Sequence, residues 1–242
     1  MVLDRLCRLI SWGRVFDFHH SGEGEEEVAK FHRSYEKLDQ GLLEHLNSTV
    51  EKSPTRTLTS GVVACIALCQ GQRVLIANLG DCRALQSKKG KIEALTRDHC
   101  PTETEETMRL AQLGLQAEDG YLCEGLSVSR AFGDFDLTTG EKCSGLICQP
   151  DVSIVEVDED TEFILLASDG LFERMDWKEV GSSTRRFLRR AQNAKTACEQ
   201  IVQQAIKLGS TDNIGAVLIT FKMPAPENGN SALRRKVVLE GL

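Results

Sequence analysis

Two aspartates stand where apolar runs of the chain begin or end. Asp169 follows the run 163–167 and precedes Gly170, and Asp212 lies in a turn that leads into a second run beginning at Ile214. A carboxylate held at the end of a strand is the kind of oxygen ligand that a hard divalent cation binds. Asp and Gly are also ordinary turn residues, so a purely structural turn at each position remains the alternative.

The segments that would position these aspartates show strand and helix patterns. Runs rich in β-formers and bounded by turn residues predict strands at 61–69, 73–78, 82–86, 92–95, 162–167 and 214–221. Apolar residues spaced by three and four predict helices over 23–46, 102–114, from 177 onward and over 194–208. Short turns join the first four strands, which favours antiparallel pairing in meander order. This order of elements predicts an α+β fold, with antiparallel sheet covered by helices.

The charge balance and apolar content narrow the class of protein. The 242 residues include 29 Lys and Arg against 36 Asp and Glu, which disfavours nucleic acid or an anionic membrane as the main partner. Hydrophobic residues make up 41%, enough for a sizeable core, and no apolar run approaches the ~20 residues of a membrane span. Charged residues also interrupt the apolar segment 1–12 before a signal peptide could form. We therefore expect a monomer in the cytoplasm or nucleus, with no nucleic-acid or membrane partner.

Nine cysteines are spread along the chain, and none of them forms a Cys-x-x-Cys pair. An odd number without such spacing indicates neither a disulfide framework nor a zinc ribbon. We expect most of these thiols to be reduced, with several of them in the core.

Five sequence motifs occur in an order that resembles one known family. They are 80–83 (GDCR), 95–101 (LTRDHCP), 126–134 (LSVSRAFGD), 167–172 (ASDGLF) and 209–214 (GSTDNI), with Pro150 between the third and the fourth. Together they are similar to the metal-dependent serine/threonine protein phosphatases of type 2C, the PPM family. The resemblance covers about two thirds of the chain, and ordered motifs are more specific than a single Asp-Gly pair.

The resemblance implies an α-β-β-α sandwich, in which two packed antiparallel sheets are flanked by helices. It also implies two Mg²⁺ or Mn²⁺ ions at one edge, which activate a water that attacks phosphorus in a phosphoprotein substrate. Asp169 and Asp212 match the two family aspartates at the first metal, and Asp98 matches one associated with a weaker third metal. Glu173 follows Asp169 by four positions, where many members carry another Asp. A strand-end cap for Asp98 and a solvated helix carboxylate for Glu173 are the alternatives.

The segment 15–19, Val-Phe-Asp-Phe-His, resembles a degraded copy of the family's Asp-Gly-His-Gly-Gly motif. By that resemblance, Asp17 would bridge the metals and Phe18 would supply the backbone carbonyl that a glycine supplies in the family. His19 would be the acid that protonates the leaving group. A chance match at Asp17 and a solvent-exposed loop role for His19 stay open.

Two further family features find no match in residues 1–16. They are the arginine that clamps the substrate phosphate and a Glu-Asp pair that supports the second metal. We expect a phosphatase-like domain over 13–223 that lacks the usual first strands, preceded by an extension over 1–12 and followed by a flexible tail over 224–242. The leading hypothesis is a metal-dependent protein serine/threonine phosphatase. Its rivals are a catalytically impaired pseudophosphatase that binds and regulates proteins, and a truncated product of low stability.

Overall fold

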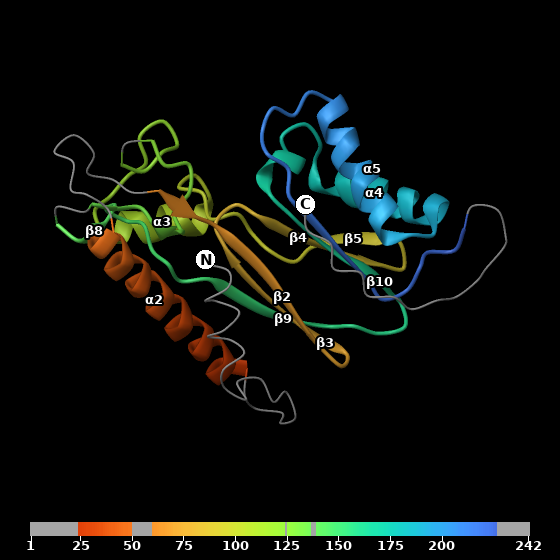
Figure 1. Cartoon of the computed structure of the whole chain (residues 1–242), viewed down its shortest axis with the longest axis horizontal. Helices are drawn as coiled ribbons and strands as arrows, with labels where there is room; N and C mark the ends of the chain where they lie inside the picture. Colours follow the sequence, from red (N-terminus) through yellow and green to blue (C-terminus); the bar gives the residue numbers. More distant parts are fainter. Residues whose placement is uncertain (1–23, 50–59, 124, 137–138, 227–242) are drawn as a thin grey trace. The chain divides into compact units, whose positions relative to one another are not determined.

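The computed structural model describes residues 24–49, 60–123, 125–136 and 139–226 (Figure 1). The chain folds into two compact units that are interleaved along the sequence. The first unit comprises Met1–Ala64, Ala77–Asp81 and Asp98–Val152, and the second comprises Cys65–Ile76, Cys82–Arg97 and Ser153–Leu242. Neither unit is therefore a continuous stretch of sequence.

The second unit contains a four-stranded β-sheet and most of a three-stranded one. Four strands pair antiparallel in the order β11-β10-β4-β5, with bounds Ala216–Thr220, Thr161–Ala167, Arg83–Lys88 and Lys91–Ala94. The other sheet has the order β2-β3-β9, with bounds Ala64–Gln70, Arg73–Leu79 and Asp151–Glu156. Between β2 and β3 the chain turns at Gly71, whose φ of 59° is a conformation that glycine adopts without steric cost.

Strand β10 lies at the centre of its sheet, and all seven of its residues are buried. Side chains alternate between the two faces of a strand, so Phe163 and Leu165 pack on one face while Ile164 and Leu166 pack on the other. The cluster around Ile164 draws residues from both sheets, including Ile76 of β3. An apolar layer therefore joins the two sheets face to face.

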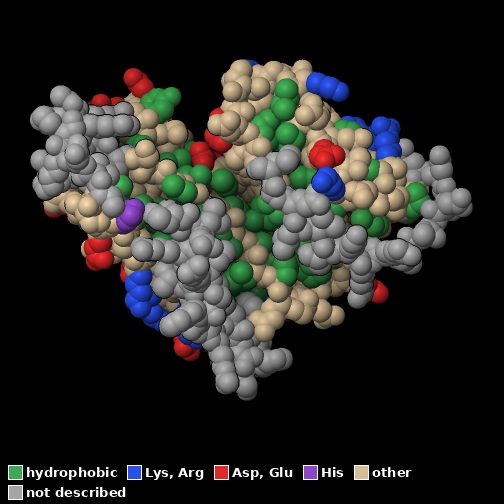
Figure 2. All heavy atoms as spheres, viewed as in Figure 1, with side chains coloured by type: hydrophobic (Ala, Val, Ile, Leu, Met, Phe, Trp, Pro, Cys, Tyr) green, Lys and Arg blue, Asp and Glu red, His purple; other side chains and the backbone are tan. Residues whose placement is uncertain are grey.

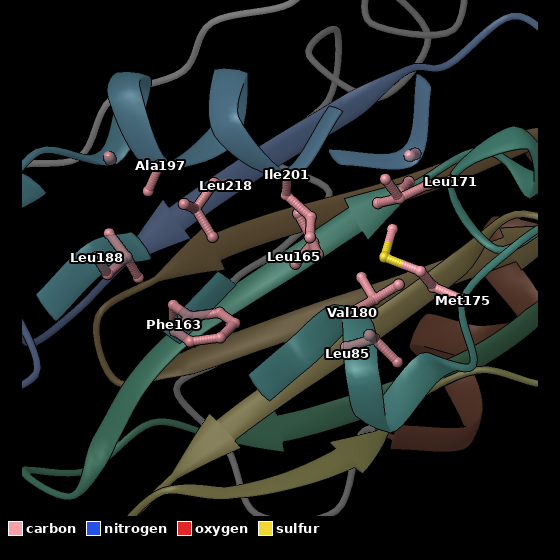
Figure 3. Packing of buried hydrophobic residues seen from close by; sticks show 13 residues of the cluster. Leu85, Phe163, Leu165, Leu171, Met175, Val180, Leu188, Ala197, Ile201 and Leu218 are labelled. Atoms are coloured by element: carbon pink, nitrogen blue, oxygen red, sulfur yellow. The ribbon is translucent and has the colours of Figure 1, made fainter. Parts of the chain in front are cut away.

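Helices α4 (Trp177–Ala191) and α5 (Ala194–Lys207) cover the opposite face of β10. Val180 of α4 and Ile201 of α5 are fully buried in the same cluster as Phe163 and Leu165. Figure 3 shows these side chains gathered between the helices and the strands. Burying a side chain of this size stabilises the folded state by about 1.5–3 kcal/mol.

Polar residues cap the start of each helix, and a left-handed residue ends α4 before α5 begins. Asp176 precedes α4 and accepts a hydrogen bond of 2.9 Å from the backbone N–H of Glu179. After α4, Gln192 adopts a left-handed conformation with φ 48°, which ends the helix. Asn193 then accepts a bond of 3.0 Å from the N–H of Thr196 and starts α5.

The first unit combines two helices with short strands. Its elements are α2 (Gly24–Thr49), α3 (Thr104–Gln112), β1 (Gly61–Val62), β6 (Phe132–Gly133), β7 (Phe135–Asp136) and β8 (Glu141–Lys142). The buried face of α2 carries Phe31, Tyr35 and Leu38, at the spacing of three and four that favours an amphipathic helix. The ring of Tyr35 lies 4.9 Å from that of Phe132, centroid to centroid, so α2 packs on the β1-β6 pair.

One disulfide joins Cys123 to Cys143 in this unit. Cys143 is buried in the apolar cluster beside α3, whereas Cys123 is exposed. The spacing of the cysteines did not predict this pair, because folding and not local sequence brings the two residues together. Six other cysteines among the described residues form no disulfide.

The predicted α+β class with packed antiparallel sheets is confirmed, and so are the positions of the main helices and strands. The predicted single meander is wrong, because the hairpins β2-β3 and β4-β5 belong to different sheets. Turn residues mark where a strand ends but not which sheet the next strand joins, and β4 pairs with the distant strand β10. Among the described residues, no helix is both long and apolar enough to cross a membrane.

Candidate functional site

Pairing of β10 with β11 brings Asp169 and Asp212 to one edge of the second unit. The two strands run antiparallel, with Ala167 opposite Ala216. The end of β10 and the start of β11 therefore lie side by side. Asp169 follows β10 and opens the short 3-10 helix η1 (Asp169–Leu171), and Asp212 lies in the loop just before β11. The structure brings together the two aspartates that the sequence predicts as metal ligands.

Ser168 joins the two loops that carry these aspartates. Its backbone N–H donates to the carbonyl of Gly215 at 2.9 Å, and its hydroxyl accepts from the N–H of Gly215 at 2.9 Å. The hydroxyl in turn donates to the carbonyl of Asn213 at 3.2 Å. The loops are thus held together by the residue that precedes Asp169.

Gly170 is required by the closeness of the same two loops. A Cβ atom at this position would lie 2.6 Å from the carbonyl oxygen of Asn213 and 3.2 Å from the Cβ of Asp212. The first of these distances is shorter than any contact a real Cβ makes with backbone. The loops of Asp169 and Asp212 therefore touch only because residue 170 has no side chain.

Both carboxylates are exposed and oriented by their own backbone. Oδ1 of Asp169 accepts from the N–H of Gly170 at 2.9 Å, and Oδ1 of Asp212 accepts from the N–H of Asn213 at 2.7 Å. An ionised carboxylate offers about four lone-pair sites, so a backbone hydrogen bond occupies only part of its acceptor capacity. Exposed oxygens on adjoining, hydrogen-bonded loops fit the chemistry of Mg²⁺ or Mn²⁺, which prefer oxygen ligands.

Three of the metal-binding residues that the sequence predicts, Asp98, Asp169 and Asp212, lie among the described residues. No group of three or more His, Cys, Asp or Glu among them is arranged to hold a metal ion. Asp17, Phe18 and His19, which the sequence also proposes, lie outside the described residues. Asp98 is half-buried in the first unit, whereas Asp169 belongs to the second, and its role at the metal stays a prediction.

Glu173, which the sequence leaves open as either a site residue or a solvated carboxylate, contacts the Asp212 loop. Its Oε2 accepts from the Ser210 hydroxyl and from the N–H of Thr211, each at 2.9 Å. Hydrogen bonds from Thr211 N–H and then from Ser210 lower the pKa of Glu173 below its usual range. The carboxylate is thus held ionised at the edge that carries both aspartates.

An ionic network in the first unit links Arg130 and His99 of the sequence motifs to Glu106 and Asp151. Arg130 donates to Oε1 of Glu106 through Nε at 2.9 Å and to Oδ1 of Asp151 at 2.9 Å. His99 accepts from the N–H of Gly80 at its Nδ1, and its Nε2 lies 3.3 Å from Oδ2 of Asp151. Arg130 and His99, which belong to two of the motifs, therefore both contact Asp151.

The pKa values of the two carboxyls follow from these partners. The hydrogen bond from His99 lowers the pKa of Asp151 to about 2, aided by Arg130 and opposed by burial. Burial alone would raise the pKa of Glu106, but hydrogen bonds from Arg130 and Arg109 outweigh it and lower the value to about 2. Both groups are therefore ionised at neutral pH and stabilise the fold.

Basic side chains gather on the second unit. Figure 2 shows several Lys and Arg side chains over the region of α4 and α5. Helix α4 contributes Arg185, which binds the buried carboxylate of Glu162 at 2.7 and 2.8 Å. Its other Arg residues include Arg186 and Arg190, both exposed.

Comparison with known proteins gives consistent matches. A sequence model of one family, described as protein phosphatase 2C, matches residues 18–214. The probable protein phosphatase 2C 54 of Oryza sativa subsp. japonica is 36% identical over 232 residues, which cover 90% of this chain and 64% of that protein. The probable protein phosphatase 2C 27 of Arabidopsis thaliana is 34% identical over 76% of this chain and 50% of its own length. The chain thus spans half to two thirds of these two relatives.

Solved structures show the same fold. The serine-threonine phosphatase 2C from Toxoplasma gondii aligns with a TM-score of 0.67 and 23% identity, covering 90% of this chain and 78% of that one. A C. elegans sex determining protein aligns with a TM-score of 0.64 and 20% identity, covering 90% and 50% of the two chains. At these identities the likeness concerns the fold alone.

Proposed function

Because the chain belongs to the protein phosphatase 2C family, we propose that it is a metal-dependent phosphatase acting on phosphoserine and phosphothreonine in proteins. The observation that carries this proposal is the contact of the two loops at Gly170, which places the carboxylates of Asp169 and Asp212 at one sheet edge. Carboxylates held in this way would bind a divalent cation.

In this mechanism the described residues would hold the cation. Asp169 and Asp212 would be its ligands, with Asp17 and the carbonyl of Phe18 completing the set for two ions. A bound Mg²⁺ or Mn²⁺ supplies an acidified water and offsets charge on the phosphoryl group. His19 would protonate the leaving serine or threonine oxygen. Asp98 would hold a further, weaker ion.

The test is hydrolysis of a phosphothreonine peptide by the full chain, with and without Mn²⁺. We expect Asp169→Asn, Asp212→Asn and Asp17→Asn each to lower turnover by about 100-fold or more, the scale of losing one charge-stabilising group. Asp119→Asn is the matched control, because Asp119 is exposed and Asn tolerates its positive φ of 51°. Full turnover in Asp169→Asn would overturn the site assignment.

A second outcome would favour the alternative function. If the protein unfolds cooperatively but no turnover exceeds that of the Asp169→Asn variant, the chain is a pseudophosphatase. Binding of the uncleaved phosphothreonine peptide, measured by fluorescence anisotropy, would then identify it as a phosphoprotein-binding module. A low, non-cooperative melting transition would instead support an incomplete product of low stability.

A further inference from the structure

Glu173 is an exposed acidic residue, and yet its carboxylate makes several contacts with protein. It follows the 3-10 helix η1 and lies four positions after Asp169. Exposed carboxylates usually point into water, where a hydrogen bond to protein gains little. Glu173 instead turns toward the loop that carries Asp212.

Both oxygens of Glu173 are engaged. Oε2 lies 2.9 Å from the hydroxyl of Ser210 and 2.9 Å from the backbone nitrogen of Thr211. Oε1 lies 3.4 Å from the hydroxyl of Thr211 and 3.2 Å from a guanidinium nitrogen of Arg174. A carboxylate with these donors has little acceptor capacity left for a cation.

The same contacts tie the loop to the segment that carries Asp169. The Ser210 hydroxyl lies 2.8 Å from the carbonyl oxygen of Gly170, next to Asp169, as well as near Glu173. Thr211, whose N–H donates a hydrogen bond to the Glu173 carboxylate, directly precedes Asp212. A shift of Glu173 would therefore move the backbone on which Asp212 stands.

We propose that Glu173 is a positioning residue, which fixes the loop 210–212 so that the Asp212 carboxylate stays beside Asp169, and that it is not itself a metal ligand. This inference deepens the proposed phosphatase function and rests on it for the identity of the cation. The length of the Glu side chain is essential, because an Asp at this position would be one methylene too short to reach Thr211.

Three variants separate positioning from ligation. Glu173→Gln keeps the length and an oxygen that accepts from Thr211, but it loses the charge that a metal ligand would need. Glu173→Asp keeps the charge and loses the reach, and Glu173→Ala loses both. Glu199→Gln on the exposed face of α5 is the matched control for removal of a surface charge.

The first measurement is hydrogen exchange of the Thr211 amide by NMR in the metal-free protein. We expect its protection to fall roughly tenfold in Glu173→Ala and Glu173→Asp, the scale of one charge-assisted hydrogen bond, and to remain in Glu173→Gln. The second is Mn²⁺ titration calorimetry, where the same two variants should bind about 10- to 100-fold more weakly. Glu173→Gln should bind Mn²⁺ within a few-fold of the unaltered chain.

Two results would overturn the proposal. If Glu173→Asp binds Mn²⁺ as tightly as the unaltered chain while Glu173→Gln does not, Glu173 is a ligand. If Thr211 protection is unchanged in Glu173→Ala, the side chain does not hold the loop. Should the unaltered chain bind no Mn²⁺ at all, the proposed function fails, and the exchange measurement alone decides whether Glu173 positions the loop.

Discussion

A buried carboxylate of the first unit and the exposed carboxylates at the site edge of the second unit have different surroundings. In the first unit, Glu106 is 2% exposed and is bound by two guanidinium groups. At the site edge of the second unit, Asp169 and Asp212 are exposed and accept hydrogen bonds from neighbouring backbone N–H groups. Buried carboxylates need cations of the protein itself. Asp212, whose printed donor is a neutral backbone N–H, keeps exposed oxygens that can accept a ligand from solution.

The strongest test of this contrast is Arg130→Met. Removing the guanidinium leaves Glu106 buried with one cationic partner fewer, and breaking a buried pair costs about 3–5 kcal/mol of unfolding free energy. Urea denaturation at pH 7 measures the loss. Arg33→Met, at an exposed position of α2, is the control and should change the free energy by less than ~0.5 kcal/mol. If Arg130→Met lowers the unfolding free energy by less than about 1 kcal/mol, the buried Glu106 does not depend on this cation.

Glu106 and Asp151 of the first unit should contribute to the pH dependence of stability. The pKa of both Glu106 and Asp151 is lowered to about 2 in the folded state, so each binds protons more readily when unfolded. Their contribution is complete above the unfolded values of about 4 and is lost as pH falls toward 2, on the order of 3 kcal/mol for Glu106. Thermal melts between pH 6 and 2 measure this decline. Arg130→Met should flatten it, and an equally steep decline in that variant would contradict the assignment.

Gly170→Ala tests the contact between the two site loops. The added methyl would lie 2.6 Å from the carbonyl of Asn213, and such overpacking costs about 1–3 kcal/mol. Calorimetry should show weaker Mn²⁺ binding together with a lower melting temperature. Gly71→Asn is the control, since nothing lies within 4 Å of a Cβ there and Asn tolerates positive φ. Unchanged Mn²⁺ affinity in Gly170→Ala would show that the loops need not touch.

The smallest expected effect on stability belongs to Asp212→Asn. An exposed carboxylate with a backbone partner that Asn can also serve should change the unfolding free energy by less than ~0.5 kcal/mol without metal. Stabilisation by added Mn²⁺ should disappear, because the ligand charge is gone. Differential scanning fluorimetry with and without Mn²⁺ measures both. A variant that loses stability without metal would place Asp212 among the structural carboxylates.

Local patterns in the sequence predicted the elements and two site residues. Strand β10 and helices α4 and α5 were found because apolar spacing and turn residues are local signals. Asp169 and Asp212 were singled out because each stands at a strand end next to turn residues, and their role as metal ligands stays a prediction. Their adjacency follows from the antiparallel pairing of β10 with β11, which the sequence suggests only through the fold class.

The parts that sequence reasoning missed depend on distant contacts. Glu173 binds Ser210 and Thr211, 37 and 38 positions away, and no periodicity reports such a pair. The disulfide closes over 20 positions for the same reason. Arg130 lies in the third motif, but its buried partner Glu106 became visible only in the fold. The predicted strand order was wrong for the same reason, because β4 pairs with the distant strand β10 and not with the preceding strand β3.

The strands that pair in the four-stranded sheet are far apart in the sequence, and this affects when the sheet can form during synthesis on the ribosome. Strand β10 needs β4 as a neighbour, and Ser87 of β4 meets Glu162 of β10 across 75 positions of sequence. Strand β11, the last described strand, completes the sheet beside β10. The two aspartate loops can therefore meet only after residues 216–220 have left the ribosomal exit tunnel. A nascent chain arrested before that point would carry the Asp169 loop without the Asp212 loop beside it.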